Sequence, residues 1–380
     1  MQKVSIVRCD SYELKKLYAA IGEAIRLAGG LGVVKGMRIV LKVNAVSRKA
    51  PERHATTHPR VIEAVARYLV ERGACVVIGD SPGGFYNERV LQALYQTCGI
   101  EQAALNAGAA LNYDTSAVSV SIPKGVRLKT IDVCKYLLEA DAIISLGKLK
   151  THCMTGFSGV VKNMFGAIPG TLKLDYHYKS PHLDDFADCL LDIAECVKPA
   201  FSILDGIIGM EGDGPTAGVP REVGVLIAGR DAHAVDIAGI RVAGMEPDSV
   251  CTVRSAMRRG LCPPDAGIEV AGERIEDVAV SNYRRATPHS IDILEMKMPA
   301  WLARMLRRLV TTRPVPSRKK CVGCGVCGEY CPAQAICMVK GLPHIDQSRC
   351  IKCYCCQELC PKEAMLAKKP LLLRLTNGRR

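Results

Sequence analysis

Two cysteine runs near the carboxyl end hold the residues with the clearest chemistry. Each run has the spacing C-x2-C-x2-C-x3-C and is followed by proline, at Pro332 and Pro361. Three closely spaced thiolates can hold three corners of a 4Fe-4S cluster, while the fourth thiolate of each run reaches the other cluster. The first predicted ligand set is Cys321, Cys324, Cys327 and Cys360, and the second is Cys350, Cys353, Cys356 and Cys331.

Zinc binding and a disulfide framework are the alternatives for these cysteines. Zinc sites typically use separated C-x2-C pairs, and disulfides need an oxidising compartment, for which we find no signal segment. Cys355 could replace Cys356 as a ligand, although the spacing fits less well, and Cys337 fits no ligand position. We therefore favour iron and sulfide, and residues 318–367 resemble a bacterial-type ferredoxin with two 4Fe-4S clusters.

The composition limits the remaining possibilities. A chain of 380 residues is long enough for two or three domains, and its 19 cysteines favour a reducing compartment, hence a cytoplasmic protein. No apolar run approaches the length of a transmembrane helix. The whole formal charge of +13 lies in residues 297–380, with 17 Lys and Arg against 4 Asp and Glu. Two oxidised clusters with eight thiolates would contribute a charge of about −4, which would offset part of this excess.

The remaining basic charge predicts an acidic partner, for which a redox protein is our first expectation. Nucleic acid is not expected, because no aromatic-rich basic motif accompanies the charge. Residues 297–317 predict an amphipathic linker helix that packs one domain on the other. The alternative is a peripheral membrane contact through residues 299–310 on the inner membrane face, assisted by the basic tail at 368–380. The oligomeric state is not specified.

Residues 1–296 alternate between strand and helix patterns. Apolar, β-branched runs predict strands at 4–7, 38–43, 74–78, 142–146, 201–204 and 223–227, and residues 112–130 suggest an antiparallel excursion. Helical spacing predicts helices at 11–28, 59–71, 132–140, 183–197 and 232–243. The alternation predicts an α/β domain whose mostly parallel sheet has helices on both faces. The cysteine runs add a small C-terminal α+β domain.

Polar residues follow several of these strands, where open α/β sheets bind ligands. Gly, Asp, Asn and Ser at such positions are also explained by the needs of turns. A single lysine there could simply be solvated at the surface. Together, however, the lysines predict a pocket that binds a carboxylate or a phosphate. The predicted substrate-binding residues are Lys42, Asn44, Lys148, Lys150, Thr151, Lys162 and Asn163.

Four further residues are the predicted catalytic groups. His152 and His177 are candidate proton donors, with a structural role as the alternative for each. Asp205 and Glu211, with Asp213 nearby, could accept a proton or hold a divalent metal. The sequence has neither a G-x-G-x-x-G nor a G-x-x-x-x-G-K-[ST] loop, so nothing specifies a dinucleotide or NTP. A flavin or other organic cofactor is not specified.

Five segments of the first 296 residues resemble domain-of-unknown-function family 362: residues 54–58, 79–82, 146–152, 161–166 and 205–215. The resemblance covers roughly residues 3–245, and members of that family are often fused to a ferredoxin domain. It implies an iron–sulfur protein and an oxidoreductase, without a particular substrate. Our first hypothesis is an enzyme that passes single electrons from two clusters to an anionic organic substrate. The alternative is an electron-transfer or accessory protein, for example in cofactor or metallocentre maturation, without turnover of its own.

Overall fold

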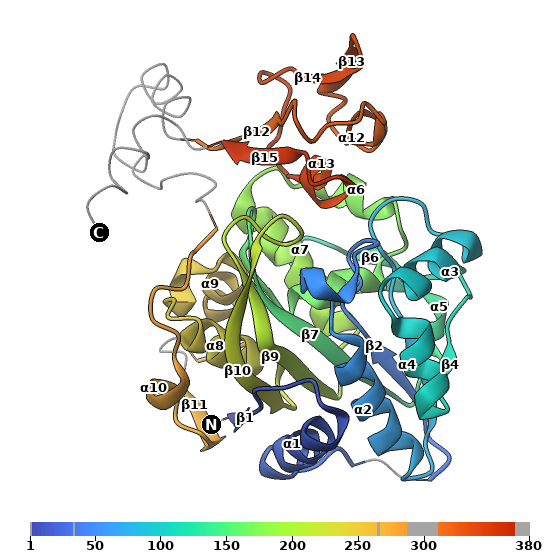
Figure 1. Cartoon of the computed structure of the whole chain (residues 1–380), viewed down its shortest axis with the longest axis vertical. Helices are drawn as coiled ribbons and strands as arrows, with labels where there is room; N and C mark the ends of the chain where they lie inside the picture. The colour runs from blue at the N-terminus through green and yellow to red at the C-terminus, as the bar shows by residue number, and fades with distance from the viewer. Residues whose placement is uncertain (1, 33–34, 264–266, 287–310, 369–380) are drawn as a thin grey trace.

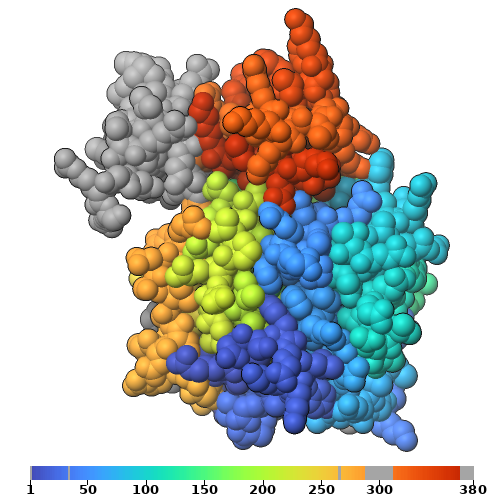
Figure 2. Space-filling view, viewed as in Figure 1, coloured from blue at the N-terminus to red at the C-terminus, as the bar shows by residue number. Residues whose placement is uncertain are grey.

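The computed structural model describes residues 2–32, 35–263, 267–286 and 311–368 (Figure 1). Residues 2–286 form an α/β domain, and residues 311–368 form a smaller unit at one end of it (Figures 1 and 2). Residues 297–310 of the predicted linker helix and all but the first residue of the predicted tail lie outside the described residues. Within the described part of the chain, no helix is long and apolar enough to cross a membrane.

A nine-stranded sheet forms the centre of the α/β domain, in the order β11-β1-β10-β9-β7-β2-β3-β4, with β8 paired to β7. The five strands from β9 to β4 are parallel to one another, and β10 is antiparallel to both β9 and β1. The strands are β1 (Gln2–Arg8), β2 (Arg38–Lys42), β3 (Cys75–Gly79), β4 (Ala110–Leu111), β7 (Ala142–His152), β8 (Gly156–Gly159), β9 (Phe201–Glu211), β10 (Val219–Gly229) and β11 (Ile268–Gly272).

Helices cover both faces of this sheet, which confirms the predicted fold class. On one face lie α1 (Leu14–Leu27), α2 (Pro59–Val70), α3 (Glu88–Thr97) and α4 (Ile100–Ala107); on the other lie α7 (Leu183–Cys196), α8 (Ala232–Val242) and α9 (Cys251–Arg258). Strand β2 illustrates the cause, because Ile39 and Leu41 enter one hydrophobic core and Val40 enters the other. A strand buried on both faces has an apolar centre, here residues 39–41 of the strand predicted at 38–43.

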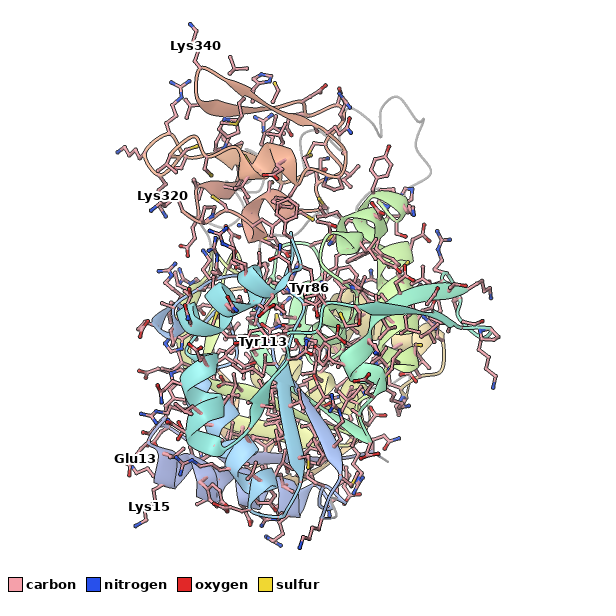
Figure 3. All side chains as sticks on the ribbon, turned by 90° about the vertical axis from the view of Figure 1, so that its right-hand side faces the viewer. Glu13, Lys15, Tyr86, Tyr113, Lys320 and Lys340 are labelled. Atoms are coloured by element: carbon pink, nitrogen blue, oxygen red, sulfur yellow. The ribbon has the colours of Figure 1, made fainter. Side chains whose placement is uncertain are left out.

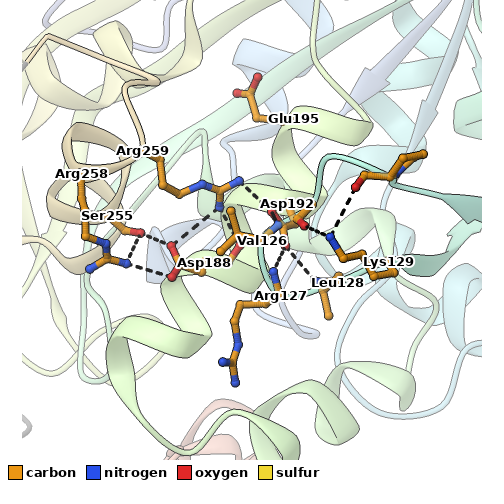
Figure 4. A network of polar contacts seen from close by, with 12 residues as sticks. Val126, Arg127, Leu128, Lys129, Asp188, Asp192, Glu195, Ser255, Arg258 and Arg259 are labelled. Atoms are coloured by element: carbon orange, nitrogen blue, oxygen red, sulfur yellow. Dashed lines mark hydrogen bonds and ion pairs between the residues drawn. The ribbon is translucent and has the colours of Figure 1, made fainter.

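Short elements complete this domain. They are α5 (Lys135–Leu138), α6 (Leu172–Lys179), α10 (Ile275–Val278) and the 3-10 helices η1 (Pro51–Arg53), η2 (Lys162–Ala167) and η3 (Pro247–Ser249). Strands β5 (Ala117–Ser121) and β6 (Thr130–Cys134) form an antiparallel pair. The prediction of a helix at 132–140 is therefore wrong in its first part, where β-branched residues pair with β5. The carboxylate of Asp192 on α7 holds this hairpin by accepting the N–H groups of residues 126–128 (Figure 4).

The C-terminal unit combines two antiparallel strand pairs with two single-turn helices. Its elements are β12 (Arg313–Pro316) paired with β15 (Met365–Lys368), β13 (Ile336–Val339) paired with β14 (Leu342–Ile345), α12 (Val326–Glu329) and α13 (Cys355–Glu358). Strand β12 occupies the end of the segment predicted as a linker. In Figure 1, α13 lies beside α6, on the side of the unit that faces the α/β domain.

Candidate functional site

The eight predicted ligand cysteines surround two cavities, four around each. The first hollow encloses about 380 Å³ of empty space, part of it open to solvent, and is lined by Cys321, Cys324, Cys327 and Cys360. The second encloses about 300 Å³, also partly open to solvent, and is lined by Cys331, Cys350, Cys353 and Cys356. These are the two sets that the spacing predicts, each completed by the fourth cysteine of the other run. Cys355 lines neither cavity, and Cys337 is exposed on β13.

The two runs fold alike around their cavities. The third residue of each run, Gly323 and Lys352, has a positive φ angle, of 70° and 58°. At the last cysteine of each run, a backbone N–H four residues later lies 3.2 Å from the sulfur: Ala335 N from Cys331 Sγ, and Ala364 N from Cys360 Sγ. The two runs therefore position their last cysteines in the same way. Among the described residues, no three His, Cys, Asp or Glu side chains converge as the ligands of a single metal ion would.

The second cavity lies closer to the α/β domain than the first. Cys353 and Cys355 are buried and belong to the same hydrophobic core as the helices α7 and α8, whereas Cys324 of the first set is exposed. The α/β domain therefore shields the second cavity from solvent more than the first.

A third hollow lies between the two parts of the chain, with a volume of about 580 Å³ that is partly open to solvent. It begins where β2 and β3 end, at Lys42 and Asp80, which agrees with the expected position of a ligand in an open α/β sheet. The α/β domain contributes Lys42, Asn44, Asp80, Ser81, Lys162, Asn163, Lys173 and His177, and α13 with the next residue contributes Cys355, Glu358 and Leu359. We call this hollow the interdomain pocket.

Lys42 is fully engaged within the protein. Its Nζ lies 2.6 Å from Asp80 Oδ1 and donates to Val43 O at 2.7 Å and to Asn163 Oδ1 at 3.1 Å. Burial lowers the pKa of Lys42, and Asp80 opposes that effect. Because an ammonium group has three donors, Lys42 anchors the pocket wall and has no donor left for a ligand.

Two other lysines have donors to spare. Lys162 makes no hydrogen bond or ion pair among the described residues, and its Nζ lies 5.7 Å from the centre of the Phe165 ring. Lys173 donates to Ser81 Oγ at 2.9 Å and to Pro82 O at 3.2 Å, which leaves one donor position. Burial lowers the pKa of Lys173 to about 8. These two cations give the pocket a positive character.

His177 is the third group that is available to a ligand. Its side chain is buried, its ring stacks on Phe186 with centroids 4.3 Å apart, and its Nδ1 has no hydrogen-bond partner. Burial lowers the pKa of His177 to about 3, so the ring is neutral near pH 7. A buried nitrogen without a partner is costly unless something else bonds to it, such as a ligand in the pocket.

His152 lies beneath α13 and does not line the pocket. Its Nδ1 accepts the N–H groups of Met154 and Thr155, so the proton of the neutral ring is on Nε2, which lies 3.0 Å from Glu358 Oε1. Burial lowers the pKa of His152 to about 4. Burial raises the pKa of Glu358, but His152 and the charge of Lys162 outweigh it and bring the value to about 2. This contact joins the second cysteine run to β7.

Lys148 and Asp205 pair with each other. Both side chains are fully buried, the Nζ to Oδ2 distance is 2.7 Å, and Tyr12 contacts both groups at 3.1 Å. Burial raises the pKa of Asp205, but Lys148 and the N–H of His58 outweigh it, so the value lies below its ordinary range. The pair does not line the interdomain pocket. Sequence reasoning had placed both residues in loops, whereas β7 and β9 continue through them because the opposite charges meet across neighbouring strands.

The remaining predicted site residues also lie outside the pocket lining. Lys150 donates to Asn44 Oδ1 at 2.8 Å and to Ala55 O at 2.5 Å, and burial lowers its pKa to about 7. Thr151 Oγ1 donates to Gly212 O at 2.7 Å. Glu211 forms an ion pair with Arg284 at 2.7 Å and has no such contact with Asp205. Of the predicted substrate-binding and catalytic residues, the pocket thus collects Lys42, Asn44, Lys162, Asn163 and His177.

Further contacts hold the C-terminal unit against the α/β domain. Glu363 pairs with Lys49 at 3.1 Å and with Arg53, and Thr216 Oγ1 donates to Gln357 O at 3.4 Å. Tyr330 meets the ring of Phe85 edge-on, with centroids 5.4 Å apart. These contacts flank α13 and keep it over the pocket.

Comparison with known proteins places this architecture in a family. A family model described as "Domain of unknown function (DUF362)" matches residues 39–241. The chain belongs to the DUF362 family. A thylakoid-associated protein of Synechocystis sp. is 31% identical over 292 residues, which cover 75% of this chain and 88% of that protein.

Two solved structures are more distant from this DUF362 chain. The lactate racemase apoprotein of Thermoanaerobacterium thermosaccharolyticum is 16% identical with a TM-score of 0.39, over 63% of this chain and 57% of that one. A protein of Thermotoga maritima is 17% identical with a TM-score of 0.35, over 58% of this chain and 56% of that one. The chain spans little more than half the length of either.

Asp80, Ser81, Lys173 and Glu358 line the pocket of this DUF362 protein but were absent from the predicted site. Asp80 and Ser81 follow β3, and their position after a strand was a usable signal, although turn chemistry also explained it. Lys173 lies on α6, away from any strand end, and no pattern in the sequence marks it.

Proposed function

We propose that this protein is an iron–sulfur oxidoreductase. In this proposal the C-terminal unit binds two 4Fe-4S clusters, and single electrons pass to a small anionic organic molecule in the interdomain pocket. One observation carries the proposal: the segment that supplies ligand cysteines to both predicted clusters also forms a wall of a cationic pocket, through Cys355, Glu358 and Leu359.

The residues around the two smaller cavities fit the clusters. Each cavity is lined by four thiols, one of which is followed by proline, and a cysteine-only donor set suits iron–sulfur clusters. A 4Fe-4S cluster supplies reversible one-electron transfer when bound. Cys356, rather than Cys355, lines the second cavity, which supports the ligand set expected from the spacing. A further organic cofactor is not part of the proposal.

The pocket residues supply binding and a proton. Lys162 and the open donor position of Lys173 suit a carboxylate or a phosphate, and His177 Nδ1 can bond to a polar group of the same molecule. Lys173, whose pKa is about 8, is protonated near neutrality but releases its proton more readily than an ordinary lysine. We therefore assign the proton to Lys173, and not to His152 or His177, whose lowered pKa values leave them neutral.

The proposal extends to location. The relative in Synechocystis is described as thylakoid-associated, which supports a peripheral membrane contact by an otherwise cytoplasmic protein. Residues 299–310 and the basic tail are the proposed contact. Flotation of the full chain with vesicles of anionic lipid at low salt tests this, and protein that stays at the bottom of the gradient excludes it.

The catalytic proposal is tested anaerobically with the full chain. The purified protein is reduced, excess reductant is removed, and a panel of small carboxylates and phosphate esters is added while the visible absorbance is followed. We expect at least one anion to reoxidise the protein faster than buffer does, and Lys162→Met to slow this more than Lys15→Met, an exposed control on α1. If anions bind but none reoxidises the protein, the enzyme proposal fails, and the alternative of an electron-transfer protein without turnover takes its place.

A further inference from the structure

The outer part of the C-terminal unit exposes apolar side chains beside the first cavity. Val322 and Met338 both line that cavity and are 62% and 38% exposed. Side chains of this size are usually buried, so two together on a small unit mark a surface that another molecule can cover. We call Val322 and Met338 the apolar patch.

Basic residues accompany the patch. Lys362 also lines the first cavity and is exposed. Lys319 and Lys320, which precede Cys321, and Lys340, which follows β13, are exposed as well. In Figure 3, Lys340 projects from the tip of the C-terminal unit and Lys320 from its flank, at the opposite end of the molecule from Glu13 and Lys15. None of these four basic side chains makes an ion pair among residues 311–368 or the other described ranges.

Acidic residues do not balance this charge on the same surface. Glu358 and Glu363 both point to the α/β domain, where they contact His152 and Lys49. The described part of the unit has only two other acids, Glu329 and Asp346. The outward surface is therefore positive, and it attracts negatively charged molecules over several ångströms.

The two cavities differ in what they face. The second lies against the α/β domain, as the buried Cys353 and Cys356 show, while the first meets solvent at the exposed Cys324. An electron that reaches the interdomain pocket from α13 must first arrive from outside, and the first cavity is the one with an exposed ligand cysteine.

We propose that the apolar patch and Lys319, Lys320, Lys340 and Lys362 dock a small acidic protein that carries single electrons. This inference rests on the proposed function. The reduced carrier loses one electron and is oxidised, the C-terminal unit gains that electron, and no bond or proton is involved. An apolar centre with charged surroundings is the usual build of a transient protein interface, and the charges speed association and select the partner.

The test uses the anaerobic full-length protein and purified flavodoxin, an acidic one-electron carrier, as the probe. Affinity is measured by calorimetry at low and at high salt, without substrate. Lys320→Glu/Lys340→Glu/Lys362→Glu should lower the affinity at least about tenfold at low salt, and the difference should shrink at high salt because salt screens the charges. The matched control, Lys15→Glu/Lys35→Glu/Lys124→Glu, changes the charge equally on exposed lysines of the α/β domain and should bind as the natural protein does.

Three results overturn the inference. The first is equal weakening by the two triple variants, and the second is equal binding of a basic cytochrome c. The third is that Lys320→Glu/Lys340→Glu/Lys362→Glu loses binding to anionic vesicles or to RNA while its flavodoxin binding is unchanged. That result would assign the surface to lipid or nucleic acid. Carrier binding is measured without turnover, so it can hold even if no anion reoxidises the protein, and the two proposals fail separately.

Discussion

Replacing Lys162 by methionine separates the ligand-binding lysines from the structural ones. Lys162 has no hydrogen bond or ion pair among the described residues, so Lys162→Met breaks no direct contact, and Glu358 keeps its contact with His152. Its free energy of unfolding should stay within about 0.5 kcal/mol of the natural protein. Lys42→Met is the contrasting variant, because it leaves Asp80 buried without the partner that lies 2.6 Å away. Breaking a buried pair in this way costs about 3–5 kcal/mol.

The expected effect on binding is the reverse. A hydrogen bond to a charged group contributes about 1.5–3 kcal/mol, so the loss of Lys162 should weaken anion binding roughly ten- to hundredfold. Malonate and inorganic phosphate serve as probes in calorimetry of the anaerobic full chain, and denaturant titration gives the stability of each variant. Removing Lys162 should also raise the pKa of Lys173, since the two cations repel each other.

The reasoning would be refuted if Lys162→Met bound both probes as well as the natural protein does. It would also be refuted if Lys162→Met destabilised the fold as much as Lys42→Met, because Lys162 would then have a structural partner.

Three further predictions follow from named contacts. Lys173 has a pKa of about 8 and can donate a proton only in its protonated form. The rate of anion-dependent reoxidation should therefore fall as pH rises through about 8. In Lys173→Met the rate should be low and should show no such fall near pH 8. Cys355→Ser should keep its full iron content, because Cys355 lines the interdomain pocket, whereas Cys356→Ser should lose iron from the second cavity, as measured by metal analysis. Asp205→Asn should lower the free energy of unfolding by about 3–5 kcal/mol, because Lys148 would stay buried without its counter-charge, yet bind malonate normally; weaker binding without destabilisation would restore Asp205 to the site.

The layered fold could be predicted because its strands are buried on both faces. Residues 39–41 are apolar, and consecutive residues enter the two cores, so the pattern indicates a strand buried on both faces. The segment at 130–134 was harder. Ile131 and Val133 are buried while Asp132 between them is partly exposed, but the five-residue strand runs directly into the short helix α5, and its start was read as helix.

The ends of β7 and β9 could not be predicted from local patterns. Lys148 and Asp205 look like loop residues when each strand is read alone, and only their pairing across the sheet makes a buried strand position favourable for either. The candidate site was limited in the same way. Lys42 and Asn163 were found because polar residues follow strands, but Lys173 on α6 and the position of α13 over the pocket depend on tertiary contacts that no spacing encodes.

Iron and sulfide analysis tests the central claim most directly. Full-length protein purified without oxygen should hold about eight iron and about eight acid-labile sulfide per chain, and its reduced form should give the electron paramagnetic resonance of two interacting 4Fe-4S clusters. Zinc in place of iron, or a protein that binds no metal at its eight ligand cysteines, would contradict the account.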